Sequence, residues 1–138
     1  MKIINKKLQF STQGNCDIVD ITDDIQEKIY EARLQNGFVN LFVPGATGAL
    51  TTIEYEPGLI KDFKNLWEKL ISERGSYFHD HGFNSNAHSH LRASVIGPSL
   101  TVPFEKGKLT LGVWQQIVFV DFDNRKRRRE IILQIVGE

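Results

Sequence analysis

The sequence predicts an α+β fold, with an antiparallel, sandwich-like β core and two main helices packed on its outside. The expected elements follow the order β-β-α-β-β-α, then a loop and three or more strands. The helices therefore do not alternate with strands in the way that a parallel sheet requires. A length of 138 residues, with 41% hydrophobic and 25% charged residues, suits one domain over residues 1–138 with its own core.

In the first half of the chain, apolar runs between polar breaks predict the strands. These runs are 2–10, 16–21, 38–43 and 49–55. Between the second and third runs, Thr22, Asp23 and Asp24 are good N-cap residues for a helix that continues to about Asn36. Gly37 is a suitable stop for that helix.

In the second half, Pro57 fits the first turn of another helix, where its missing N–H is not needed. The apolar residues of that helix recur at helical spacing, and we expect them to pack in the core. They are Leu59, Phe63, Leu66, Trp67 and Leu70. The polar stretch 73–90 is predicted as a loop, followed by one or two helical turns over 91–96. The remaining strands are expected at 100–104, 113–122 and 129–136.

The amino-acid composition limits the kinds of molecule that this chain is expected to bind. Lysine and arginine total 17 and aspartate and glutamate total 17, so the formal net charge is zero. Such a balance gives no general attraction to nucleic acid or to an anionic membrane, and it does little to oppose self-association. The single cysteine excludes an internal disulfide, and no apolar run approaches the roughly 20 residues of a membrane span. We therefore expect a cytoplasmic protein that binds neither nucleic acid nor membrane.

All four histidines fall between residues 79 and 90, in two His-x-His pairs. They are His79, His81, His88 and His90. In an extended backbone, residues i and i+2 face the same way, so each pair is expected to present two imidazoles to one point. Three imidazoles, or two with a carboxylate, form an open catalytic metal site, for which Glu54, Asp80, Asp121 and Asp123 are possible oxygen donors. A single general acid/base histidine, or a set of exposed loop histidines without a function, are the alternatives.

Other segments offer groups that can hold an anion. The bend at 44–48 carries two glycines and Thr47, although a tight bend without a ligand is the more common interpretation. The basic run 125–129 is typical of a solvated turn or a guarded edge strand, with a phosphate clamp or an RNA patch as alternatives. Trp114 and Gln115 should point to opposite faces, one to the core and one to a cavity or a neighbouring subunit.

Several motifs resemble the YjbQ-type family, in order and over essentially the whole chain. They are 102–117 with its glycine-tryptophan-glutamine signature, 86–94 followed by 97–99, 121–125 with 127–130, and the terminal 136–138. Tyr77 with His79 is similar to the family's aromatic-x-His element. The resemblance implies a compact α+β fold built on a β-sandwich, usually a homotrimer, with a polar site near the subunit contacts.

Members of that family are commonly labelled secondary thiamine-phosphate synthases, which join a pyrimidine diphosphate to a thiazole phosphate and release pyrophosphate. The resemblance carries the family's histidines onto His79, His88 and His90 and its carboxylate onto Glu54. Many members have a histidine and two small hydroxylic residues where this chain has Gly45-Ala46-Thr47. His81 is the local candidate to replace that histidine.

These arguments combine into a homotrimeric enzyme acting on a phosphorylated small molecule in a histidine-rich, metal-binding pocket. The predicted catalytic residues are His79, His81 and Glu54. The predicted metal ligands are His79, His88 and His90. The predicted substrate-binding residues are Thr47, Thr51, Arg92, Gln115, Arg125 and Arg129. Imidazole ligands favour zinc or another transition metal over magnesium. A metal-dependent hydrolase and a non-catalytic protein that binds a metal or phosphometabolite are the alternatives.

Overall fold

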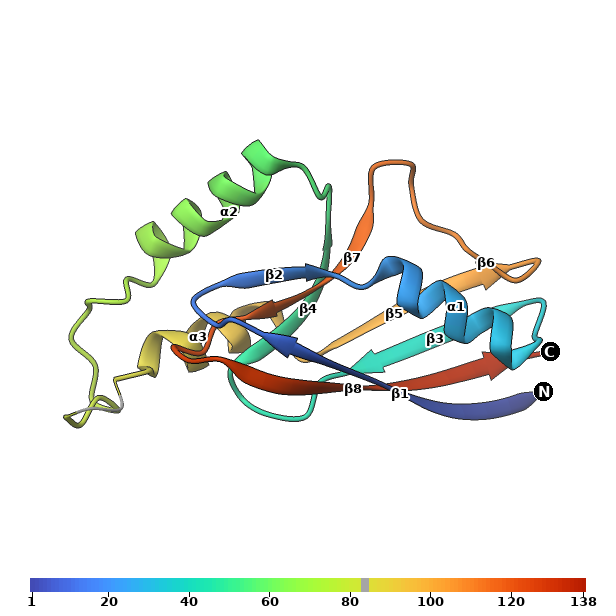
Figure 1. Cartoon of the computed structure of the whole chain (residues 1–138), viewed down its shortest axis with the longest axis horizontal. Coiled ribbons are helices and arrows are strands. Elements are labelled where there is room, and N and C mark those ends of the chain that lie inside the picture. Colours follow the sequence, from blue (N-terminus) through green and yellow to red (C-terminus); the bar gives the residue numbers. More distant parts are fainter. Residues whose placement is uncertain (83–84) are drawn as a thin grey trace.

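Two antiparallel sheets curl around a shared core to form a half-barrel in the computed structural model, which describes residues 1–82 and 85–138 (Figure 1). The five-stranded sheet has the order β1-β8-β3-β5-β6, and the three-stranded sheet has the order β2-β7-β4. The strands are β1 (Lys2–Thr12), β2 (Asp17–Asp20), β3 (Gly37–Phe42), β4 (Gly48–Ile53), β5 (Ser99–Glu105), β6 (Lys108–Leu109), β7 (Gln116–Asp121) and β8 (Arg127–Gly137). The helices are α1 (Thr22–Ala32), α2 (Pro57–Leu70) and α3 (Ala87–Ile96). The predicted α+β class with antiparallel sheets is confirmed.

The side chains of strand β7 pack into two separate hydrophobic cores, one on each face of the strand. Its side chains alternate, so Ile117 and Phe119 face the larger cluster, which includes α1 and the centre of β8. Val118 and Val120 face a second cluster that includes Trp67 of α2 and Ala93 of α3. A strand buried on both faces is apolar at every position, and this is why the run 117–120 lacks the polar alternation of a surface strand.

Helix α1 begins at Thr22 and ends at Ala32, short of Asn36. The predicted capping residues lie within its first turn, and Ile21 occupies the N-cap position without a side-chain capping bond. Arg33 adopts the left-handed conformation with φ of 57° and closes the helix. The N–H groups of Gln35 and Asn36 then donate to the carbonyl of Glu138, which holds this connection against the end of β8. Gly37 does not stop the helix. It begins β3, where a Cβ would stand 1.9 Å from the carbonyl oxygen of Val136.

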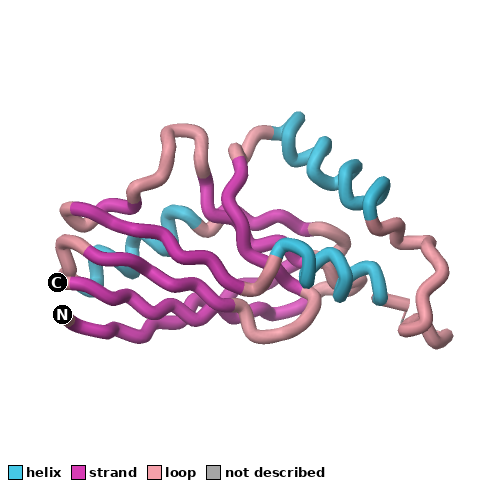
Figure 2. Tube along the Cα trace, turned by 180° about the vertical axis from the view of Figure 1, so that it is seen from behind, coloured by secondary structure: helices cyan, strands magenta, loops and turns pink. Residues whose placement is uncertain are grey.

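Helix α2 begins at Pro57 as predicted, and the side chain of Glu56 accepts hydrogen bonds from the next free N–H groups. The prediction that its whole apolar stripe is buried was wrong. Leu66 and Leu70 are 47% and 63% exposed, and Trp67 is the buried residue of the helix. The helix contacts the body of the protein along one edge and extends away from the sheets (Figures 1 and 2).

The third helix corrects the predicted loop over 73–90. Helix α3 starts at Ala87, so His88 and His90 lie on a helix rather than in an extended loop. Its first N–H donates to the Asp80 carboxylate, 3.0 Å away, whereas the side chain of Asn86 at the N-cap position makes no capping hydrogen bond. Residues 83–84 of the predicted loop lie outside the described residues. At 100° per residue, positions i and i+2 of a helix point roughly 200° apart. His88 and His90 therefore cannot address one point.

Two strand boundaries also differ from the prediction. Strand β7 starts at Gln116 rather than Val113, because residues 110–115 form a projecting loop between β6 and β7 (Figure 1). Strand β8 starts at Arg127, so the last part of the basic run belongs to a strand paired with β1. None of the described helices combines the length and the apolar character needed to cross a membrane.

Candidate functional site

One cavity of about 510 Å³ gathers three of the four histidines. His79 and His81 reach it from the segment before α3, and His90 reaches it from the first turn of α3. The ring centroids of His79 and His90 are 4.8 Å apart, and those of His79 and His81 are 6.4 Å apart. The other lining residues are Ala46, Thr47, Asn86, Asp123, Asn124, Arg125 and Arg127. The cavity thus collects residues from four separate segments of the chain.

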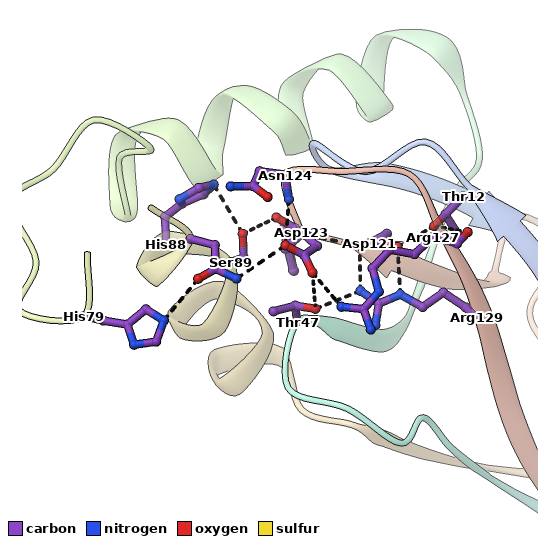
Figure 3. A network of polar contacts seen from close by, with 12 residues as sticks. Thr12, Thr47, His79, His88, Ser89, Asp121, Asp123, Asn124, Arg127 and Arg129 are labelled. Atoms are coloured by element: carbon purple, nitrogen blue, oxygen red, sulfur yellow. Dashed lines mark hydrogen bonds and ion pairs between the residues drawn. The ribbon is translucent and has the colours of Figure 1, made fainter. Parts of the chain in front are cut away.

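His88 lies on the other side of α3 from this cavity (Figure 3). Its side chain is buried, and among the described residues its Nδ1 has no hydrogen-bond partner. Burial, together with the positive charge of Arg92, lowers the pKa of His88 below its ordinary value of 6.5. His88 is therefore a neutral interior side chain at physiological pH.

Replacing His88 with glutamine is expected to reduce the acid sensitivity of the fold. The unfolded chain binds a proton at His88 below a pKa of 6.5, whereas the folded chain resists it. The free energy of unfolding should therefore fall as the pH drops below that value. Urea unfolding of the wild type and of His88→Gln across this range measures the difference. His81→Gln, at an exposed position, is the control and should keep the wild-type slope; equal slopes in wild type and His88→Gln would contradict the prediction.

Asp123 forms the floor of the cavity as an ionised carboxylate (Figure 3). Arg127 donates to its Oδ2 over 2.7 Å, and Thr47 donates to the same oxygen over 3.2 Å. The Asn124 N–H and the Asn86 side-chain amide donate to its Oδ1. Burial alone would raise the pKa of Asp123, but these hydrogen bonds and the Arg127 charge outweigh it and hold the pKa at about 2.

This carboxylate determines which nitrogen of His79 can accept a proton. Because a carboxylate only accepts hydrogen bonds, the Asn86 amide turns its NH₂ group toward Asp123. The Asn86 oxygen then faces Nε2 of His79 at 3.1 Å. That oxygen also only accepts, so Nε2 carries the hydrogen in neutral His79. The lone pair lies on Nδ1, and Nδ1 is the nitrogen that can act as a base.

Converting Asp123 to asparagine is expected to cost about 2 kcal/mol of unfolding free energy at neutral pH. The ordinary pKa of 3.8 falls to about 2 on folding, so the carboxylate stabilises the fold above 3.8. This stabilisation is lost as the pH falls through about 2, where the wild type and Asp123→Asn should converge. Urea unfolding at several pH values measures the effect. Asp24→Asn, on the exposed face of α1, serves as the control, and a constant difference down to the lowest pH would contradict the prediction.

Beneath the cavity, Arg129 and Asp121 form a buried ion pair (Figure 3). Nε and Nη2 of Arg129 each donate to one oxygen of Asp121 over 2.8 Å. Nη2 also donates to the hydroxyl of Thr47, which in turn contacts Asp123. Thr12 completes the group by donating to Asp121. Arg129 therefore supports Thr47 from below and does not face the cavity, where the sequence had predicted a substrate contact.

Arg125 is the cation that remains available in the cavity. It is exposed, and it makes no ion pair with any residue that the structure describes. Its neighbour Arg127 is committed to Asp123. Within the basic run, Arg125 thus faces the cavity without an ion-pair partner among the described residues, Arg127 neutralises Asp123, and Arg129 is buried beneath the cavity.

Two of the predicted substrate-binding residues instead hold the scaffold together. Arg92 is buried and donates to the carbonyl of Ile71, just after α2, and it pairs with Glu68 at 3.1 Å. Gln115 lies in the projecting loop, where it donates to the Thr52 hydroxyl over 3.1 Å. Neither side chain lines the histidine cavity.

Thr51 and Glu54 also lie apart from the histidines. Thr51 pairs with Val118 in the middle of β4, and Glu54 follows the far end of that strand. Since a strand rises about 3.3 Å per residue, Glu54 is roughly 20 Å from Thr47 at the cavity. Glu54 instead lines a separate surface cavity beside Tyr55 and Trp114. Within this chain, the predicted carboxylate and the histidines are not brought together.

Asn86 and Arg127 are site residues that sequence reasoning did not single out, and Asp123 appeared only as a possible metal ligand. A signal for them was present. Asp121 and Asp123 stand at alternate positions at the end of an apolar strand, and Arg127 and Arg129 alternate in the same way. Carboxylates at the end of one strand and arginines at the start of the next predict ion pairs between them, because a buried charge needs a partner.

The predicted metal ligands do not converge. Among residues 1–82 and 85–138, no three His, Cys, Asp or Glu side chains are placed to hold a metal ion. His79 and His90 share the cavity, whereas His88 lies behind the helix. The side chains as arranged do not fit the predicted three-histidine centre, and the metal stays a prediction.

The sequence matches the family model described as UPF0047 protein YjbQ-like over residues 6–138. The chain belongs to the YjbQ family. A UPF0047 protein of Archaeoglobus fulgidus is 41% identical over 126 residues, which cover 91% of this chain and 97% of the relative. One from Methanothermobacter thermautotrophicus is 33% identical, over 100% of this chain and 95% of the relative.

Solved structures of YjbQ relatives share the fold. A crystal structure from Sulfolobus solfataricus, described as a YbjQ-like protein of unknown function, superposes with a TM-score of 0.93 at 31% identity and covers 99% of both chains. A hypothetical protein from Aeropyrum pernix superposes with a TM-score of 0.90 at 31% identity, over 98% of this chain and 99% of that one. The YjbQ family and fold are thereby confirmed, and the names of these relatives assign no activity.

Proposed function

We propose that the cavity binds a phosphorylated small molecule and that His79 moves a proton in a reaction of that molecule. The observation that carries the proposal is the convergence of three imidazoles and the free guanidinium of Arg125 on one cavity. Guanidinium groups pair with phosphate through two parallel hydrogen bonds, and an imidazole is the usual proton carrier near neutral pH.

The charges of the cavity suit an anion despite its acidic floor. Arg127 compensates the carboxylate of Asp123 at 2.7 Å, so that carboxylate is paired inside the protein. Arg125 then adds an unpaired positive charge at the cavity surface. A phosphate beside Arg125 would lie within reach of His79, His81 and His90, all of which line the same space.

The specific reaction that we propose is the coupling of a pyrimidine diphosphate with a thiazole phosphate, which the sequence resemblance implies. The thiazole nitrogen forms a bond to the methylene carbon of the pyrimidine, the carbon–oxygen bond breaks, and pyrophosphate leaves with the bonding electrons. Arg125 and the protonated imidazoles would stabilise the charge that develops on pyrophosphate, and protonated His79 would pass the proton on its Nδ1 to the leaving oxygen. Ala46 and His81 line the same cavity, which supports His81 as the replacement for the family's missing histidine.

We also propose that the protein is a homotrimer, which would bring Glu54 of one subunit toward the histidines of a neighbour. Val113 and Trp114, beside Glu54, are 81% and 70% exposed in the isolated chain. Light scattering should give three times the chain mass of 15.8 kDa, and Trp114→Glu should lower it. A wild-type mass of one chain would overturn this assembly.

The activity is tested by supplying both thiamine precursors to the purified protein and following thiamine phosphate and pyrophosphate. We expect both products in equal amounts. Release of pyrophosphate without coupling would overturn the synthase in favour of a hydrolase. Binding of the precursors without any turnover would favour a non-catalytic binding protein. Elemental analysis of protein purified without a histidine tag tests the predicted transition metal independently.

A further inference from the structure

A second cavity, of about 630 Å³, adjoins the histidine cavity. The two cavities share the rings of His79 and His90, which meet edge to face at 71°. The other walls of the second cavity come from the segment before α3 and from α3 itself. They are Ser76, Tyr77, Phe78, Ala87 and Leu91.

The two neighbouring cavities differ in chemistry. The first contains Arg125, Arg127 and Asp123, whereas the described lining of the second contains no aspartate, glutamate, lysine or arginine. Phe78 is fully exposed and Leu91 is 44% exposed, so both side chains present apolar surface to an occupant of the second cavity. Aromatic side chains bind flat rings by edge-to-face and offset stacking.

We infer that the second cavity holds an aromatic or heteroaromatic ring of the same ligand whose phosphate lies at Arg125. This inference rests on the proposed phosphate site. The shared imidazoles place an apolar compartment directly beside an anion-binding one, so the ligand class is a flat ring joined to phosphate or diphosphate by a short linker. Phe78 and Leu91 offer apolar contact that a flat ring can use and that the hydroxyl groups of a sugar phosphate cannot.

The test compares the affinities of phenyl phosphate and methyl phosphate, measured by calorimetry. The wild type is expected to bind phenyl phosphate about tenfold more tightly, the gain expected from burying part of one ring. In Phe78→Ser and Leu91→Ser this ratio should approach one, while the affinity for methyl phosphate is unchanged. Val95→Ser removes an exposed apolar side chain of the same helix that does not line the cavity, and it should keep the wild-type ratio.

The outcomes separate the two proposals. If methyl phosphate binds and phenyl phosphate gains nothing, the ring site is wrong and the phosphate site stands. If neither binds, the phosphate site fails and the ring site fails with it. An equal loss of the ratio in Val95→Ser would assign the effect to the helix as a whole and overturn the ring site. A change of mass in Phe78→Ser, without a change of the ratio, would make this face a contact between copies instead.

Discussion

Asp121→Ala is expected to lower the free energy of unfolding by about 3–5 kcal/mol, the usual cost of leaving a buried charge without its partner. Asp121 is fully buried, and Arg129 is only 4% exposed. Removal of the carboxylate leaves the guanidinium with the Thr47 hydroxyl as its one remaining side-chain acceptor among the described residues. Urea unfolding of the purified variant measures the loss, and a fall in soluble expression should accompany it.

The neighbouring position supplies the control for this prediction. Arg128 is exposed on the same strand, so Arg128→Ala should change the free energy of unfolding by less than about 0.5 kcal/mol. The double variant Asp121→Leu with Arg129→Met removes both charges and should recover much of the loss. A cost below about 1 kcal/mol for Asp121→Ala would show that the pair does not hold the floor of the cavity.

His79→Ala is expected to reduce kcat/KM for precursor coupling by about 10²–10⁴-fold, the range for loss of a general acid/base. The Asn86 oxygen leaves Nδ1 of His79 as the nitrogen that gains a proton and passes it to the leaving pyrophosphate, and alanine provides no replacement. Asn86→Leu should give a smaller loss and a shifted pH profile, since it frees the ring to change tautomer and leaves the base in place. Steady-state kinetics over a range of pH values measure both effects.

His88→Gln is the matched control, because His88 belongs to the same cluster in the sequence and lies outside the cavity. Its kcat/KM should remain within about twofold of the wild type, since the side chain meets no substrate. Equal losses in His88→Gln and His79→Ala, with both proteins folded, would remove the distinction between cavity and interior histidines.

The prediction of the histidine site from sequence depended on one local assumption. Segment 73–90 is polar and contains glycine and asparagine, so it favoured a loop with extended His-x-His pairs. Tertiary contacts start α3 at Ala87 instead, because Asp80 caps its first N–H and Ala93 packs beneath it. Of the two pairs, the one before the helix stays together, and the one on the helix is divided between the cavity and the interior.

The orientation of the arginines could not be predicted from local sequence either. Sequence order placed Arg125, Arg127 and Arg129 in one basic run, which gave no means of ranking them. The pairing of β8 with β1 determines that Arg129 turns inward to Asp121, because strand residues alternate between faces. The order of elements and the apolar strands were predictable from local pattern. The pair of Arg129 with Asp121 joins strands of two different sheets, and local pattern does not show how those sheets pack together.

Nuclear magnetic resonance of the histidine rings, with inorganic pyrophosphate added, tests the shared anion cavity most directly. The chain has four histidines, so each ring serves as a separate probe. The resonances of His79, His81 and His90 should move with a common saturation curve, those of His88 should stay in place, and Arg125→Ala should weaken the response. If no histidine resonance shifts when pyrophosphate is added, or if the His88 resonances shift as much as the others, the cavity does not bind the anion as proposed.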